Sequence, residues 1–294
     1  MLIGMRNAIL AGGAAPGPTP AYRGLCFTAE AANSSVQLTA VGSPPAVTLV
    51  KSFDGINWEA YAVGEVIDLP STGDLVYLAA GEGGNESFGS SASAYHKFVI
   101  NGLVAASGDI TSLRRFDLEQ TTLAAFCYDS MFYGCTGLTS APELPATTLA
   151  TYCYTSMFYG CTGLMSAPEL PATTLATNCY HYMFRSCTGL TSAPELPATK
   201  LAAFCYTSMF YGCTGLTSAP ELPATKLAIN CYVSMFRNCA KLSLIRVHFT
   251  AWGKQTTNWV TSVSSAGTFY KPSALSEEFG ESKIPTGWTV VNID

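Results

Sequence analysis

The chain has 294 residues, of which 48% are hydrophobic and only 12% are charged. This length allows two or three domains with packed cores, and the scarcity of charge leaves Ser, Thr, Asn, Gly and Tyr to cover the surface, as suits a protein exposed to proteases or glycans. A net charge of −5 without a basic run argues against a nucleic-acid partner, and no stretch approaches the ~18 apolar residues of a membrane span.

Residues 1–20 read MLIGMRNAILAGGAAPGPTP. A secretory signal needs a core of ~7–15 apolar residues, whereas the short run from Ala8 to Leu10 is followed by two glycines. A lipoprotein signal is disfavoured too, because the bulky Leu25 precedes Cys26 where a small residue is needed. The sequence therefore predicts no export signal.

Residues 21–110 contain short β-branched or aromatic runs separated by turn sequences such as DGIN and STGD. Regular short strands with such turns predict a small β-sandwich-like or jelly-roll-like domain. Trp58 and Tyr61 alternate on one expected strand, and we interpret them as core or edge residues, with a glycan platform as the alternative. The expected strands are SVQLTAV, AVTLVKSF, WEAYAVG, DLVYLAAG and HKFVING.

A 26-residue repeat occupies residues 111–244, where a half-unit at 118–126 precedes the first full unit, which begins at Cys127. Ten of the eleven cysteines keep this period, and Cys26 is the exception. Such fidelity at a fixed period predicts a solenoid, in which each unit winds once as a coil. The repeated Met-Phe pairs begin at Met131, Met157, Met183, Met209 and Met235.

Each unit is expected to contain a short helix and an extended segment. CYTSMFYGC, residues 153–161, has apolar residues at relative positions 0, 1, 4, 5 and 8, which predicts a helix with a wide apolar face. Thr-Gly ends that helix, and the prolines of LTSAPELP favour extended backbone. The pattern is lost after Cys239, so residues 245–294 are predicted to form a C-terminal cap over the open end.

The run MFYGCTGLTSAPELPATTLA resembles the BspA-like leucine-rich repeat, as a long variant of a unit that is usually shorter. The resemblance covers about residues 111–245, and the ending GTFYKP…IPTGWTVV is similar to caps of that family. It implies an α+β solenoid with parallel strands on one side and short helices on the other. Members are typically surface adhesins or binding proteins, not enzymes. The matching residues are Phe132, Cys135, Leu138, Ala141, Leu144 and Pro145.

Other segments resemble phage proteins. SFDGINWEAY and VAASGDITSL resemble leader domains of BspA-like proteins from Bacteroides-type gut bacteria and their phages, and IGMRNAILAGG resembles the start of virion or prophage structural proteins from that group. This implies a virion protein assembled in the host cytoplasm, with residues 1–20 as a peptide that attaches it to other virion proteins. Such appendages are commonly homotrimers. The alternative is a bacterial cell-surface adhesin.

Cys153, Met157 and Cys161 form a stripe of sulfur-containing side chains that recurs in every unit. Residues eight apart on one helix are separated by ~12 Å, so the two cysteines cannot share a metal ion or a disulfide. Equivalent cysteines of neighbouring coils would lie ~5 Å apart at strand spacing. The favoured interpretation is a buried core ladder, with cross-coil disulfides or a metal as alternatives.

Two columns of exposed side chains are the candidate ligand-binding residues. An acidic column, which is expected to stop at Val247, is interpreted as solvated carboxylates or as a groove for a cation such as calcium. A Tyr–Arg column on the opposite face suits an interface or sugar stacking, with ordinary surface residues as the alternative. The acidic column is Asp117, Glu143, Glu169, Glu195 and Glu221, and the Tyr–Arg column is Tyr133, Tyr159, Arg185, Tyr211 and Arg237.

The sequence carries no recognisable catalytic motif. His96, His181 and His248 are isolated, and there is no Gly-rich phosphate loop, GxSxG elbow or HExxH motif. We therefore predict a non-enzymatic virion appendage of the fibre or decoration type. It would need no cofactor and would present its repeat surface to a host-surface glycan or protein.

Overall fold

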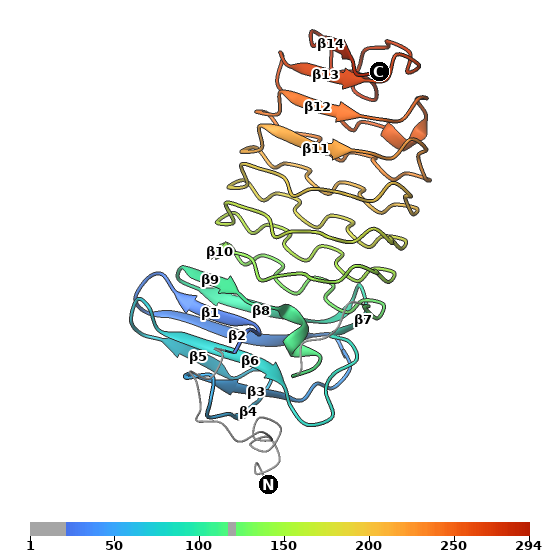
Figure 1. Cartoon of the computed structure of the whole chain (residues 1–294). Coiled ribbons are helices and arrows are strands. Elements are labelled where there is room, and N and C mark those ends of the chain that lie inside the picture. Colours follow the sequence, from blue (N-terminus) through green and yellow to red (C-terminus); the bar gives the residue numbers. More distant parts are fainter. Residues whose placement is uncertain (1–21, 117–121) are drawn as a thin grey trace, which may run out of the picture.

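The computed structural model describes residues 22–116 and 122–294, and Figure 1 shows an elongated molecule. Within these ranges strands dominate, and the only helices are the short 3-10 helices η2 (Ile110–Leu113) and η3 (Lys254–Thr256). Neither is long or apolar enough to cross a bilayer. The expected attachment peptide, residues 1–20, lies outside the described residues, as does Asp117 of the acidic column.

The first part of the chain forms two β-sheets. The strands are β1 Cys26–Ala29, β2 Ser34–Val41, β3 Leu49–Ser52, β4 Glu59–Tyr61, β5 Val66–Leu69, β6 Leu75–Ala80, β7 Gly89–Ser91, β8 Ala94–Asn101, β9 Val104–Ser107 and β10 Leu138–Ser140. One sheet has the order β10-β9-β1-β6-β3-β4 and the other β5-β2-β8-β7. All pairs are antiparallel except β9 with β10.

The two sheets share a core, in which the rings of Phe27 on β1 and Phe98 on β8 lie 4.9 Å apart. Strands β3, β4 and β6 fall within the expected runs, and β2 and β8 overlap theirs but begin one and two residues earlier, whereas β1, β5, β7 and β9 were not predicted. Two sheets that pack around one core are the basic arrangement of a β-sandwich. The more specific sandwich-like or jelly-roll-like architecture stays a prediction.

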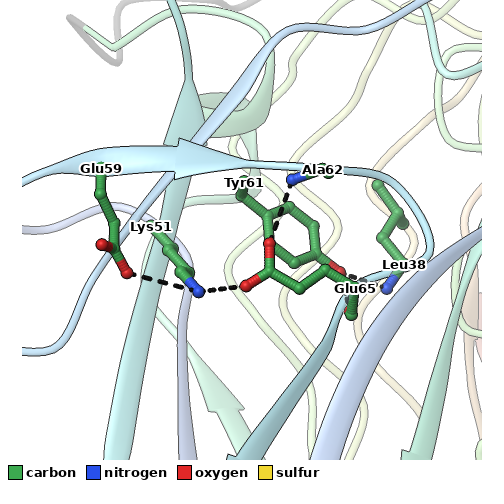
Figure 2. A network of polar contacts seen from close by, with 6 residues as sticks. All are labelled: Leu38, Lys51, Glu59, Tyr61, Ala62 and Glu65. Carbon is green, nitrogen blue, oxygen red and sulfur yellow. Dashed lines mark hydrogen bonds and ion pairs between the residues drawn. The ribbon is translucent and has the colours of Figure 1, made fainter.

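A polar network fixes the edge of the larger sheet (Figure 2). Lys51 pairs with Glu65 and lies 3.3 Å from Glu59 (Nζ–Oε1), and the bond to Glu65 is the main cause of its raised pKa. The Tyr61 hydroxyl accepts a hydrogen bond from the Leu38 N–H (2.7 Å) and donates one to the Glu65 carbonyl (3.0 Å). Tyr61 is buried on the edge strand β4, in agreement with its interpretation as a core or edge residue.

The repeat unit contains no helix, so the prediction of a short helix over CYTSMFYGC is wrong. The segment is a chain of overlapping turns in which odd-numbered residues donate to the carbonyl three residues back, as Met157 does to Tyr154 (3.3 Å). Even-numbered residues donate to the next coil, as Phe158 does to Met183 (2.9 Å). Every backbone N–H from residue 152 to 161 is satisfied in this way, half within the coil and half between coils.

A positive φ recurs at every fourth residue of these turns. In the second unit it occurs at Tyr152 (59°), Ser156 (52°) and Gly160 (73°). Each of these residues is the third of the four residues in its turn, the position at which a type II turn requires a positive φ. A residue with positive φ cannot belong to a right-handed helix. Along the turns, two successive side chains point into the core and the next two point outward. The apolar positions that were predicted to face the core are therefore buried although no helix forms.

Substitutions of Ser156 distinguish the turns from a helix. At φ 52° glycine is favoured over alanine by about 1 kcal/mol, whereas in a helix interior alanine is favoured by about the same amount. We expect Ser156→Gly to have a higher free energy of unfolding than Ser156→Ala in urea denaturation. A more stable alanine variant would contradict the turn geometry.

Two columns of buried aromatic rings run through the solenoid. The phenylalanine column is stacked from Phe132 to Phe236, with centroids 5.4–5.8 Å apart. The tyrosine column runs beside it from Tyr128 to Tyr232 at 5.8–6.1 Å, and both columns end on Trp259. Such stacks bury large apolar surfaces in well-defined rotamers, so each coil depends on its neighbours.

The N-terminal sheets provide the surface on which the first coil stacks. Phe98 continues the phenylalanine column (5.2 Å to Phe132), and Phe88 continues the tyrosine column (6.1 Å to Tyr128). The N–H groups of these residues also donate to the first coil, Phe88 to the Cys127 carbonyl (3.0 Å) and Phe98 to that of Met131 (2.7 Å). The sheets therefore cover the proximal end of the solenoid.

A parallel sheet continues past the recognisable repeat. Strands β11 (Ser218–Leu222), β12 (Leu244–Val247), β13 (Thr268–Lys271) and β14 (Thr289–Asn292) pair in that order, as the orange and red end of Figure 1 shows. The parallel strands that the resemblance implied are therefore present here. Residues 245–294, expected to be a cap, also extend the stack.

Candidate functional site

The repeat cysteines are all buried, and the second cysteine of each unit from Cys161 on donates a hydrogen bond to the preceding coil. The Cys161 Sγ lies 3.1 Å from the Phe132 carbonyl oxygen, and Cys187, Cys213 and Cys239 each repeat this contact one coil further on at 3.0 Å. Burial raises the pKa of these thiols, to about 12 for Cys187, so they are protonated at neutral pH. The interpretation of the sulfur stripe as a core ladder is confirmed, and all eleven cysteines are free thiols in the described residues.

The four described members of the acidic column, Glu143, Glu169, Glu195 and Glu221, are all exposed. The expectation that the column meets Val247 is wrong, because the pairing slips by one residue and brings Arg246 opposite Glu221. Val247 is buried opposite Leu222. The His248 Nε2 lies 2.6 Å from Glu221 Oε1, so Arg246 and His248 give the distal end of the column a basic boundary.

Asp109 lies at the proximal end of the acidic column. It forms a parallel bridge with Glu143, whose N–H donates to the Gly108 carbonyl (2.8 Å). Burial raises the pKa of the Asp109 carboxyl, and its Oδ1 accepts a hydrogen bond from the Thr111 N–H (2.7 Å). Among the described residues no group of three or more His, Cys, Asp or Glu is arranged to hold a metal ion. The calcium groove stays a prediction.

The Tyr–Arg column forms one continuous stack on the outside of the turns. The rings of Tyr133 and Tyr159 lie 4.7 Å apart, and the Arg185 guanidinium lies 5.5 Å from the Tyr159 ring and 4.3 Å from the Tyr211 ring. Arg237 continues the column, 5.9 Å from the Tyr211 ring. Since the neighbours in the stack cover these ring faces, the column exposes ring edges, hydroxyls and guanidinium N–H groups rather than open ring faces.

Arg185 also lies over the ring of Tyr182 at 5.1 Å, and His181 stacks on that ring at 3.6 Å. Burial, together with the Arg185 charge, lowers the pKa of His181 to about 4, so His181 is neutral at physiological pH. Neither Arg185 nor Arg237 forms an ion pair with a carboxylate of the described residues. The column therefore presents two positive charges that are held in place by aromatic rings.

The three histidines occupy separate environments. The Nδ1 of His96 is 3.1 Å from the Phe88 carbonyl oxygen in the core of the first sheets, whereas His181 stacks on Tyr182 and His248 pairs with Glu221. None of these contacts joins a histidine to a serine or cysteine side chain, so they do not build a nucleophile–base pair.

A hollow of about 530 Å³, which the sequence did not predict, lies at the junction between the two N-terminal sheets and the first coil. Its residues come from four separate stretches of the chain, which no local pattern connects. The sequence offered one signal, since Cys26, the cysteine outside the repeat, lies in it. The lining is Tyr22, Arg23, Gly24, Cys26, Thr28, Leu75, Tyr77, Ser107, Gly108 and Glu143.

The fold places the chain in the class of β-solenoids, with a β-sheet region at the proximal end. No family model, curated protein or solved structure matched the sequence or the fold. The resemblance to BspA-like repeats rests on the repeat motif, and the helices it implied are not formed.

Proposed function

We propose that this chain is a non-enzymatic binding protein whose Tyr–Arg column contacts a glycan or protein on a host surface. The observation that carries the proposal is the pair Arg185 and Arg237, which have no carboxylate partner among the described residues. The guanidinium of Arg185 lies among three tyrosine rings, and that of Arg237 lies over the Tyr211 ring. A stacked guanidinium can donate planar pairs of hydrogen bonds while losing little side-chain entropy on binding.

We place this binding protein on a phage particle that infects a Bacteroides-type host, as a fibre or decoration protein. Residues 1–20 would attach it to other virion proteins during assembly in the host cytoplasm, and it would act as a homo-oligomer such as a trimer. The resemblance of IGMRNAILAGG, SFDGINWEAY and VAASGDITSL to proteins of that group supports this setting. The alternative is a bacterial surface adhesin.

The state of the N-terminus distinguishes these two settings. N-terminal sequencing of the mature protein would favour the adhesin if the first ~20 residues were missing, since an exported protein loses its signal. A virion protein keeps them, and a map of the assembled particle would show them against capsid, portal or tail protein.

The Arg185→Tyr/Arg237→Tyr double variant tests the contact surface. Tyrosine occupies this position in the other coils, at 133, 159 and 211, so the stack is preserved while two charges are removed. We expect the affinity of the labelled protein for Bacteroides-type host cells to fall at least about tenfold, and its salt dependence to weaken, because arginine is enriched among the interface residues that dominate binding energy. Flow cytometry at two salt concentrations measures both.

Lys200→Thr/Lys226→Thr is the matched control. It removes the same charge and restores the threonine found in the equivalent positions 148 and 174. Retained binding in this control is expected. Equal losses in both variants would show that only net charge matters, and unchanged binding in the arginine variant would overturn the proposed surface.

A further inference from the structure

The hollow at the junction has a floor of side chains on the outer face of three paired strands. Cys26 on β1 lies opposite Tyr77 on β6 and opposite Ser107 on β9, so these three side chains form one row across the sheet. Thr28 on β1 and Leu75 on β6 form the next row. The floor is therefore built on paired strands, which hold its side chains in fixed positions.

The walls come from the chain entering β1 and from the first coil. The Tyr22 ring is held by Trp58 at 4.8 Å and meets the Tyr77 ring edge-to-face at 5.8 Å. On the other side Glu143 is fixed through its backbone, whose N–H donates to the Gly108 carbonyl. The first coil thus contributes one residue, Glu143, to a hollow that is otherwise lined by the N-terminal region.

The lining combines aromatic rings, hydroxyl groups and two opposite charges. Thr28 and Ser107 supply hydroxyls, while Arg23 and Glu143 contribute one positive and one negative charge, so the lining is neutral overall. Its volume of about 530 Å³ falls within the ~300–1,000 Å³ typical of small-ligand sites. Balanced charge disfavours an ion, whereas rings beside many donors and acceptors suit a polyhydroxylated ring.

We propose that this hollow is a saccharide-binding subsite that takes a neutral mono- or disaccharide unit. The inference deepens the proposed function, since it assumes that the host partner is a glycan, but it uses residues separate from the Tyr–Arg column. Glu143 and Arg23 would bind sugar hydroxyls, with Tyr22 and Tyr77 against the apolar face of the ring.

The chemistry of the hollow favours binding over catalysis. Among the described residues that line the hollow, Cys26 alone carries a thiol, and it is 7% exposed. Burial raises the pKa of this thiol, with hydrogen-bond contacts to Thr28, Ser107 and Tyr77 opposing the shift. A protonated thiol is a weak nucleophile, so we assign Cys26 to the floor and no covalent step to the site.

Saturation-transfer NMR on the full chain tests the subsite. The probes are the methyl glycosides of glucose, galactose and mannose and N-acetylglucosamine, with glucuronic acid as the charged comparison. We expect at least one neutral probe to bind, with glucuronic acid weaker. Ser107→Leu, which fills the hollow, and Glu143→Gln, which removes one charge, should each weaken that binding about tenfold or more.

Glu195→Gln is the matched control, since Glu195 holds the same column position two coils away, outside the hollow. It should bind the probe as the parent does, and so should Arg185→Tyr/Arg237→Tyr. Absence of binding by every neutral probe, stronger binding of glucuronic acid, or equal binding by Ser107→Leu and the parent would overturn the subsite. Each of these outcomes leaves the cell-binding test of the Tyr–Arg column intact, so the two proposals fail separately.

Discussion

Replacement of Asp129 by threonine is expected to raise the free energy of unfolding by about 3 kcal/mol at about pH 7.5. Asp129 is 2% exposed, its Oδ2 is buried without a hydrogen-bond partner in the described residues, and its Oδ1 accepts from the Ser130 hydroxyl at 2.8 Å. Threonine occupies this position at 155 and 207, where its hydroxyl donates to a carbonyl of the next coil at 2.6 Å. The equivalent positions of the repeat therefore show that threonine satisfies its polar group at this buried site.

The gain should depend on pH. Burial raises the pKa of Asp129 from 3.8 to about 6, so folding opposes ionisation of this carboxyl. Below about pH 3.8 the carboxyl is protonated in both the folded and the unfolded state, so it lowers the free energy of unfolding only slightly. Between about pH 3.8 and about 6 the unfolded state ionises while the folded state still holds the proton, so the native protein loses stability that the threonine variant keeps. The advantage of the variant should shrink to well under 1 kcal/mol near pH 4.

Urea denaturation of the parent and of Asp129→Thr at the two pH values checks this prediction. Asp129→Asn is the control, because it removes ionisation and keeps the shape of the side chain. Both variants should remove the same pH-dependent part of the stability. An advantage of Asp129→Thr that is equal at both pH values would contradict a buried carboxyl with a raised pKa.

Phe184→Ala is expected to lower the free energy of unfolding by about 3–5 kcal/mol. Phe184 is fully buried in the middle of its column, with Phe158 at 5.5 Å and Phe210 at 5.7 Å. Its removal leaves a cavity and also weakens the contact between two halves of a stack in which each coil touches only its neighbours. Thermal unfolding should therefore separate into two transitions.

Met165→Ala is the matched control for Phe184→Ala. Met165 lies in the same repeat region but is 67% exposed, so its truncation should change stability by less than about 0.5 kcal/mol. Calorimetry measures both variants. A single transition with a loss of under about 1 kcal/mol in Phe184→Ala would contradict a column that couples the coils.

The period and the inward positions of the repeat could be predicted from sequence because burial alone determines them. Cys153, Tyr154, Met157, Phe158 and Cys161 are all buried, as expected. The conformation could not be derived from this pattern, because a helix and a series of four-residue turns both place inward pairs at this spacing. A signal was nonetheless present. Gly160, Asn178 and Asn230 occupy positions with positive φ, and glycine and asparagine tolerate that conformation best.

Features that depend on strand register or on contacts between distant segments could not be predicted from the sequence. Arg246 lies opposite Glu221 because the strand pairing shifts by one residue at an irregularity between Ser218 and Glu221. The regular 26-residue period gives no sign of this shift. The hollow joins Tyr22 to Glu143 across the whole N-terminal region. The five members of the Tyr–Arg column were identified by period alone, and the structure adds the stacking that orders them.

Hydroxyl-radical footprinting of the protein bound to Bacteroides-type host cells tests the central claim most directly, since it reports which tyrosines the partner covers. We expect the column residues Tyr133, Tyr159 and Tyr211 to be oxidised more slowly in the bound protein than in the free protein. Tyr270, which lies on β13 outside the column, should react equally in both. Protection of Tyr270 with no protection of the three column tyrosines would contradict the account.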